Sequence, residues 1–173
     1  GNQPQDIGWS SLDVGRLLIV LAIVKRHSPE FSEYVDKAVL RWNFCELISL
    51  DGELYGGLIQ DGQLIRYKEG RLGIEEYTSY GYLDWQIVPE KAMNIEPYDV
   101  ATIYDIDLIF DGRDPRVFNV LRPVYSTPYL WMGLEFNWDK VGDTTSSDAT
   151  HTNQTLSAMA DAIYQVQEAR WDN

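Results

Sequence analysis

The longest hydrophobic run of the chain lies near its start and predicts a helix that is buried on every side. Residues 17–24 are all apolar, and a helix that is hydrophobic all round must be covered all round. Ser10, followed three residues later by Asp13, has the spacing of a capping box, so the helix should begin near Ser11. We therefore expect residues 11–26 to form the most buried helix of the fold.

The next segment predicts an amphipathic helix. Ser28 and Pro29 are typical of a helix start, and apolar residues then recur every three or four positions opposite a charged face. A fully apolar helix joined by a short turn to an amphipathic one forms a helical hairpin with an inner and an outer member. The sequence thus predicts that residues 11–26 pack antiparallel to a helix spanning roughly 29–43.

Turn-forming pairs then indicate a small antiparallel β insertion. An Asp-Gly pair at 51–52 predicts a turn between strands at 47–50 and 53–55. A second Asp-Gly pair, at 61–62, predicts a further strand over 63–67.

Three more helices are predicted after the β insertion. They begin at Ile74, at Thr127-Pro128 and at about Gln154. Between the first two, residues 102–110 and 116–121 have the pattern of strands. Four aspartates of this region do not match EF-hand spacing, so we interpret them as an acidic hairpin, with calcium binding as the alternative: Asp105, Asp107, Asp111 and Asp114.

Composition excludes several classes of partner. The 173 residues suffice for one domain with a real core, and the net charge of −13 argues against nucleic acid or an anionic membrane surface. No apolar run reaches the length of about 20 residues that a membrane span needs. One cysteine excludes a thiolate metal cluster, and two histidines argue against a histidine-rich zinc site. We therefore expect no metal and no cofactor. The 11 tyrosines and 6 tryptophans suit sugar rings and protein interfaces alike.

Residues 67–82 carry the chemistry that a core does not need. This stretch holds three glycines, three glutamates, one arginine and four tyrosines. Its second half has helical spacing, which places Glu75 and Glu76 in a first helical turn, where the helix dipole alone accounts for acidic residues. Glu69 and Arg71 lie in the preceding loop, where no dipole explains them. We therefore expect a functional site here.

Four segments resemble the signatures of a bacterial family known as domain of unknown function 3131. They are residues 8–18, 69–77, 128–136 and 167–171, and their order agrees with the family over nearly the whole chain. The resemblance implies an α/α toroid of the kind that several glycan hydrolases use, and an exported protein, periplasmic or extracellular.

The expected fold class is therefore mainly α, an incomplete α/α toroid with a small antiparallel β-sheet insertion. The family domain is usually about twice as long, which makes residues 1–173 a single domain that is a fragment or a truncated version of a longer toroid. An unfinished ring would expose its inner helices, so we expect a homo-oligomer, by default a dimer. The alternative is a monomer in which the β segments fold back over the core.

The expected function is that of a carbohydrate-active protein resembling glycoside hydrolases. Such chemistry needs a carboxylic acid and a second carboxylate in one cleft, and we expect Glu69 to be the acid and Asp13 its partner. Capping, or pairing with Arg16, explains Asp13 equally well. The candidate catalytic residues are Glu69, Asp13, Glu75, Glu76 and Glu135. The candidate substrate-binding residues are Trp9, Arg16, Arg71, Tyr77, Tyr80 and Trp131. The alternative is a non-catalytic glycan-binding or oligomeric scaffold protein.

Overall fold

The computed structural model of the chain describes residues 7–69, 72–93, 98–111, 127–136 and 147–172. These residues divide into a first unit, 1–70 with 78–94, and a second unit, 71–77 with 95–173. The first turn of helix α3, Ile74–Leu83, belongs to the second unit, and the rest of this helix belongs to the first.

Helix α1, Ser11–His27, begins where the capping pattern predicts. Ser10 is extended, and its Oγ accepts a hydrogen bond from the backbone N–H of Asp13 at 3.0 Å. This bond satisfies one of the N–H groups that a helix start leaves without a partner.

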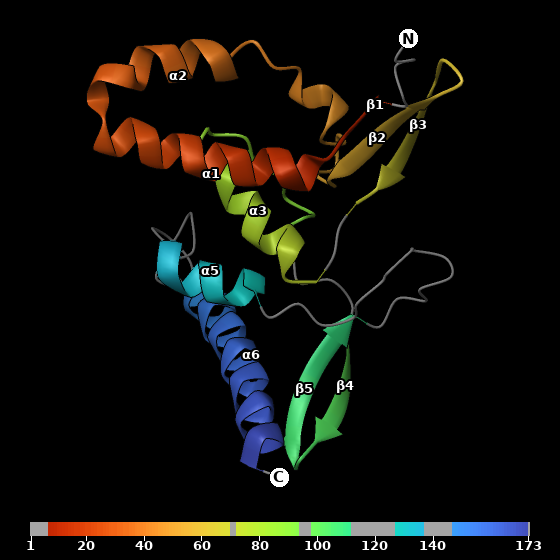
Figure 1. The fold of residues 1–173 in the computed structure, drawn as a ribbon, viewed down its shortest axis with the longest axis vertical. Helices are drawn as coiled ribbons and strands as arrows, with labels where there is room; N and C mark the ends of the chain where they lie inside the picture. Colours follow the sequence, from red (N-terminus) through yellow and green to blue (C-terminus); the bar gives the residue numbers. More distant parts are fainter. Residues whose placement is uncertain (1–6, 70–71, 94–97, 112–126, 137–146, 173) are drawn as a thin grey trace. The chain divides into compact units, whose positions relative to one another are not determined.

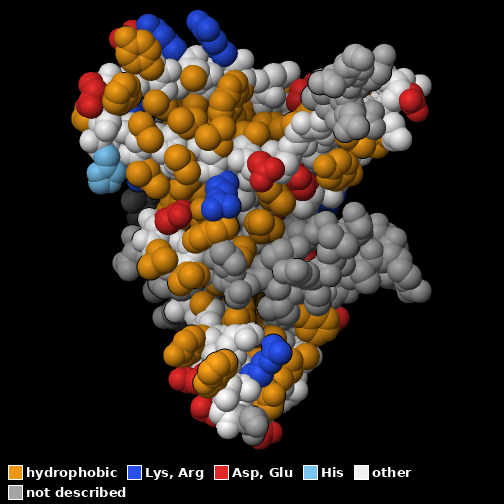
Figure 2. Space-filling model, viewed as in Figure 1, with side chains coloured by type: hydrophobic (Ala, Val, Ile, Leu, Met, Phe, Trp, Pro, Cys, Tyr) orange, Lys and Arg blue, Asp and Glu red, His pale blue; other side chains and the backbone are white. Residues whose placement is uncertain are grey.

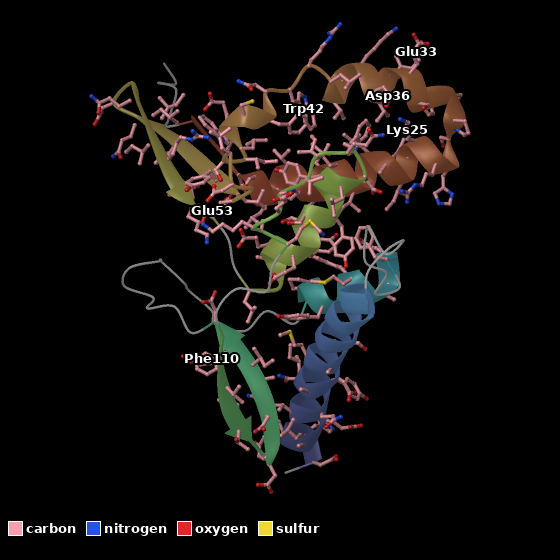
Figure 3. All side chains as sticks on the ribbon, turned by 180° about the vertical axis from the view of Figure 1, so that it is seen from behind. Lys25, Glu33, Asp36, Trp42, Glu53 and Phe110 are labelled. Atoms are coloured by element: carbon pink, nitrogen blue, oxygen red, sulfur yellow. The ribbon has the colours of Figure 1, made fainter. Side chains whose placement is uncertain are left out.

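The predicted helical hairpin is confirmed. A short 3₁₀ turn, η1 (Pro29–Phe31), leads into α2 (Ser32–Val39), which runs back along α1 (Figure 1). Lys25 of α1 and Asp36 of α2 point toward one another (Figure 3), with Nζ 2.6 Å from Oδ1. Both side chains are partly exposed, so this pair fixes the alignment of the helices more than it stabilises them.

The expected burial of α1 on every side is wrong. Leu18 and Ile19 are 0% and 2% exposed, but Leu17, Val20 and Ile23 are 44%, 49% and 39% exposed. The helix is covered by α2 and by α3, and its remaining apolar face has no cover from the described residues. The most buried helix is instead α3, in which every residue from 75 to 82 is buried.

Two glycines let α1 and α3 cross with their backbones almost touching. A Cβ atom on Gly81 would lie 1.9 Å from the carbonyl oxygen of Gly15, and one on Gly15 would lie 2.6 Å from that of Thr78. Next to this crossing, the buried hydroxyl of Tyr82 donates a hydrogen bond to the carbonyl oxygen of Ser11 at 2.6 Å. The start of α1 is thus fixed against the end of α3.

The core of the first unit forms around this crossing. Side chains of α1, α2, α3 and the loops beside them meet in one apolar cluster of buried residues: Leu18, Val35, Val39, Leu54, Tyr82 and Ala92. Trp42, which follows α2 (Figure 3), and Phe44 pack against it, with their rings 6.2 Å apart.

A three-stranded antiparallel sheet completes the first unit. Its order is β1 (Ile7–Trp9), β2 (Tyr55–Gln60) and β3 (Gln63–Lys68). Asp61 and Gly62 turn the β2–β3 hairpin with φ of 50° and 75°, which are the positive values that such two-residue turns require. The second predicted turn is therefore confirmed. The first predicted hairpin is reduced to a single bridge, and β1 was not predicted.

Lys91 joins the loops beside this sheet through two acids. Its Nζ lies 2.6 Å from Glu53 (Figure 3) and 3.1 Å from Asp51. Bonding to Lys91 lowers the pKa of Glu53, and bonding to Ser49 and then to Lys91 lowers the pKa of Asp51. The pKa of Lys91 is raised in turn. These groups form an ordinary surface ion-pair network.

The second unit contains a hairpin where a single strand was predicted. Strands β4 (Tyr98–Ile103) and β5 (Ile106–Asp111) pair across a turn at Tyr104 and Asp105, whose φ angles are 53° and 62°. The prediction of one strand over 102–110 is thus wrong, because this turn lies inside it. The other predicted strand, 116–121, lies outside the described residues.

Two helices accompany the β4–β5 hairpin. Helix α5 spans Thr127–Phe136, which confirms the predicted start. Helix α6, Ser147–Asp172, begins earlier than predicted, runs along β5 and also packs on α5 (Figure 1). No helix among the described residues combines the length and the apolar character that crossing a membrane requires.

The expected fold class, a mainly α incomplete toroid, is also wrong. The described residues form two antiparallel sheets, one of three strands and one of two, beside the helices, so the fold is mixed α and β. In a toroid of hairpins each helix packs on other helices. Here α6 packs against strand β5, because residues 98–111 form a hairpin of strands.

Candidate functional site

Glu69, the expected acid, binds the start of α1. Its Oε2 accepts hydrogen bonds from the backbone N–H of Ser11 at 2.6 Å, from the Ser11 hydroxyl at 2.9 Å and from the Leu12 N–H at 3.3 Å. A carboxylate suits this position because the free N–H groups and the dipole of a helix start favour negative charge. Burial, followed by the charge of Glu69, raises the pKa of Tyr82. Glu69 therefore joins the loop after β3 to α1.

The other predicted residues of the first unit have mixed surroundings. Asp13 and Arg16 are exposed on α1, whereas Tyr80 is only 7% exposed. Trp9 is half-buried, and its ring lies against Gly57, where a Cβ atom would come within 2.3 Å of the indole. Asp13 and Glu69 thus share one end of α1.

A second group of predicted residues meets in the second unit, where the first turn of α3 faces α5. Tyr77 is its centre. The Tyr77 hydroxyl donates a hydrogen bond to Oε2 of Glu135 at 2.7 Å. The Tyr77 ring lies 5.1 Å from the ring of Trp131 at 41°, and 6.2 Å from that of Phe136. Tyr77 is 1% exposed, whereas Glu135 is exposed and Trp131 half-buried.

Three buried carboxyl groups accompany this aromatic group. Glu75, Glu76 and Asp111 are 0%, 4% and 3% exposed. Glu76 accepts the backbone N–H of Gly73 at 2.6 Å, and Asp111 accepts that of Leu72 at 3.4 Å. The two N–H groups precede α3, so these acids hold the loop that enters the helix.

Tyr129 of α5 closes the same group. Gly73 has φ of +87°, and a Cβ atom there would lie 2.9 Å from the Tyr129 ring. Burial, and then the charges of Glu76 and Asp111, raise the pKa of Tyr129. We name this set the α3–α5 cluster and define it as Glu75, Glu76, Tyr77, Asp111, Tyr129, Trp131 and Glu135.

The predicted site residues thus fall into two sets. The α3–α5 cluster contains five of them: Glu75, Glu76, Tyr77, Trp131 and Glu135. The first unit contains another five: Trp9, Asp13, Arg16, Glu69 and Tyr80. Arg71 lies outside the described residues.

Sequence reasoning missed two members of the α3–α5 cluster. Asp111 was predicted to belong to an acidic hairpin, with calcium binding as the alternative, although its place at the end of an apolar strand was a signal of burial. Tyr129 stands beside Trp131 in the first turns of a helix, and no pattern separates it from an ordinary core tyrosine. No group of three or more His, Cys, Asp or Glu side chains in the described part of the chain is placed to hold a metal ion.

Two cavities bounded by described residues lie away from these candidates. One, of about 300 Å³, lies between α1 and the residues that follow α3, and its wall includes Lys25, Arg26 and Trp85. Its two cations are paired, Lys25 with Asp36 and Arg26 with Asp84 at 2.7 Å. The other, of about 370 Å³, lies between the β4–β5 hairpin and α6.

Comparison with known proteins gives a family and no closer relative. No curated protein and no solved structure matches the chain. A family model described as "Protein of unknown function (DUF3131)" matches residues 1–173, the whole of the chain. The chain therefore belongs to the DUF3131 family.

Proposed function

We propose that this chain is a carbohydrate-active protein, related in chemistry to glycoside hydrolases, and that its site is the α3–α5 cluster. The observation that carries the proposal is the contact of Tyr77 with both Trp131 and Glu135. An aromatic face beside a carboxylate is what a sugar ring requires, since the ring stacks on the face and its hydroxyls bind the acid. Trp131 and Glu135 are both accessible from solvent.

The carboxyl groups of the cluster differ in their exposure to solvent, and glycoside hydrolysis uses two carboxyl groups in different roles. Glu75 is 0% exposed, and a carboxyl group shielded from bulk water is the usual setting of a proton donor. Glu135 is exposed and accepts a hydrogen bond from Tyr77, which suits a nucleophile or base that substrate can reach. In this scheme Glu75 protonates the leaving glycosidic oxygen while Glu135, directly or through water, attacks the anomeric carbon.

Glycan binding without catalysis is the second candidate, and the burial of the acids favours it. Glu76 and Asp111 are engaged with the backbone N–H groups of Gly73 and Leu72. Substrate would reach Glu75 only after the side chains that cover it move. Binding needs only Trp131 and Glu135, which are already accessible.

Two assays on one set of variants separate these functions. Sugar release from α- and β-linked glucans, measured as new reducing ends, is expected to fall at least about hundredfold in Glu75→Gln and Glu135→Gln, since each acid–base group contributes that much. Retention of the chain on glucan gels is expected to weaken in Trp131→Ala and to persist in Glu75→Gln.

Glu33→Gln is the matched control, because Glu33 is an exposed acid paired with Lys37 at 2.5 Å on α2. It should leave both readouts unchanged. Retention without sugar release would establish the binding function and reject catalysis. A chain that neither releases sugar from any glucan nor is retained by one would contradict both.

We also propose that the chain forms a homodimer through the exposed face of α1. Leu17, Val20 and Ile23 are each more than a third exposed, and a contiguous exposed apolar face normally marks an interface. Light scattering is expected to give twice the chain mass of 19.9 kDa, with Val20→Glu returning it to the single mass. A mass of one chain that does not change with concentration would rule the dimer out.

A further inference from the structure

The larger described cavity has a mainly aliphatic wall. It lies between the β4–β5 hairpin and the last turns of α6, and its volume is about 370 Å³. Leu108 of β5 and Ile163 and Val166 of α6 form its buried side, at 8%, 7% and 7% exposed. Ile103, at 38% exposed, forms the side open to solvent. Figure 2 shows hydrophobic side chains gathered on the surface of the α6 and β4–β5 region, at the bottom of the view.

Tyr104 at the rim of this cavity occupies an unusual backbone position. It is the first residue of the β4–β5 turn, with φ of +53°. Asparagine and glycine adopt this conformation readily, whereas an aromatic residue does so only with strain. The tyrosine is nevertheless half-exposed, at 49%, so core packing does not account for its presence. Its side chain lines the cavity.

Arg170 supplies a positive charge at the same rim. It lines the cavity from the end of α6, and among the described residues no side chain forms an ion pair or hydrogen bond with it. The chain carries 27 acids and 14 bases, so acidic partners are plentiful, and Arg16, for comparison, is engaged. A guanidinium at the mouth of an aliphatic cavity is complementary to an anion that carries an apolar tail.

We propose that this cavity binds a medium-chain aliphatic carboxylate, with the carboxylate on Arg170 and the chain between Ile103, Leu108, Ile163 and Val166. A group the size of water takes about 30 Å³, so the cavity holds on the order of twelve heavy atoms, as in decanoate. A longer acid leaves part of its chain in water, and a shorter one leaves part of the cavity empty. This site is independent of the glycan function proposed for the α3–α5 cluster.

Calorimetric titration of the whole chain with decanoate tests the proposal. Binding of one decanoate per chain is expected. Arg170→Gln should weaken it at least about tenfold, because a charge-assisted bond is lost. Decanol has no carboxylate, so its affinity for the wild-type chain should be about as low as the affinity of decanoate for Arg170→Gln. Hexanoate should bind more weakly than decanoate.

Charge reversal separates recognition of the anion from a general effect on folding. Arg170→Glu should lose decanoate and gain decylammonium, which a merely destabilised protein would not do. The control is Arg41→Gln, since Arg41 is an exposed arginine in the first unit, and it should bind decanoate as the wild type does. Equal affinity of wild type and Arg170→Gln, absence of binding at millimolar decanoate, or decanoate acting only by changing the oligomer mass would each overturn the proposal.

Discussion

Replacing Gly81 with alanine is expected to destabilise the first unit by about 3 kcal/mol or more, although the same change in an ordinary helix stabilises it by up to about 1 kcal/mol. The reason is the crossing of α1 and α3. The added methyl group would lie 1.9 Å from the carbonyl oxygen of Gly15, a backbone atom that no rotamer change can move aside. The helices must therefore separate, and the hydrogen bond from Tyr82 to Ser11 would be lost with the contact.

Chemical denaturation followed by far-UV circular dichroism measures this effect. Gly62→Asn is the control, because a Cβ atom at Gly62 would meet nothing within 4 Å, and asparagine tolerates the φ of +75° there. That variant should stay within about 0.5 kcal/mol of the wild type. A stabilised or unchanged Gly81→Ala protein would mean that α1 and α3 do not cross at these glycines.

Local signals in the sequence predicted the elements whose formation depends on near neighbours. Ser10 caps α1 through the N–H of a residue three positions on. Asp61 and Gly62 form the β2–β3 turn by themselves, because each adopts positive φ. The helical spacing after Gly73 gave α3. Each of these features is decided within a few residues, so the pattern is sufficient.

Features that depend on distant partners could not be predicted in this way. Strand β1 has three residues and exists because it pairs with β2, some 50 positions later. The apolar run of α1 predicts that the helix is buried, but it does not predict which faces of α1 are covered by α2 and α3. Gly15 and Gly81 looked like ordinary helix glycines, because their role appears only when the two helices meet.

The prediction of an α/α toroid was wrong for a related reason. The resemblance identified the family correctly. The toroid that it implied was supported in the sequence by one predicted helical hairpin only. Residues 98–103 and 106–111 both suit strands, and the turn between them uses Tyr104 and Asp105 rather than the usual Asn-Gly. Because no recognisable turn signal separates the two strands, the sequence pattern predicts one strand where the structure has a hairpin.

The candidate site was predicted only in part, because its residue types can be read from the sequence but their distant contacts cannot. The sequence showed that Glu75 and Glu76 stand at a helix start. It did not show that both side chains are buried. Glu69 stood out because a loop has no dipole, yet it is bound to the dipole of another helix, α1, through Ser11 and Leu12. Sequence spacing cannot show that pairing, since 58 positions separate Glu69 from Ser11.

Replacing Glu69 with alanine is expected to destabilise the first unit by about 2–4 kcal/mol. Its Oε2 accepts bonds from two backbone N–H groups and the Ser11 hydroxyl, and bonds to a charged group contribute about 1.5–3 kcal/mol each when partly buried. Ser11 is 0% exposed, so water does not readily replace the lost acceptor. Glu69→Gln keeps an oxygen acceptor and loses the charge, and it should cost about half as much.

A double-mutant cycle with Ser11→Ala isolates the side-chain part of this contact. The coupling between Glu69→Ala and Ser11→Ala, taken from urea unfolding at low salt, is expected to be about 1 kcal/mol. The loss of unfolding free energy in Glu69→Gln should be smaller in high salt, because salt screens the attraction between a partly exposed carboxylate and a helix start. Sugar release by Glu69→Gln should follow only its folded fraction. A stable Glu69→Gln protein that releases no sugar, while the wild type does, would instead make Glu69 a catalytic acid and remove the anchoring role.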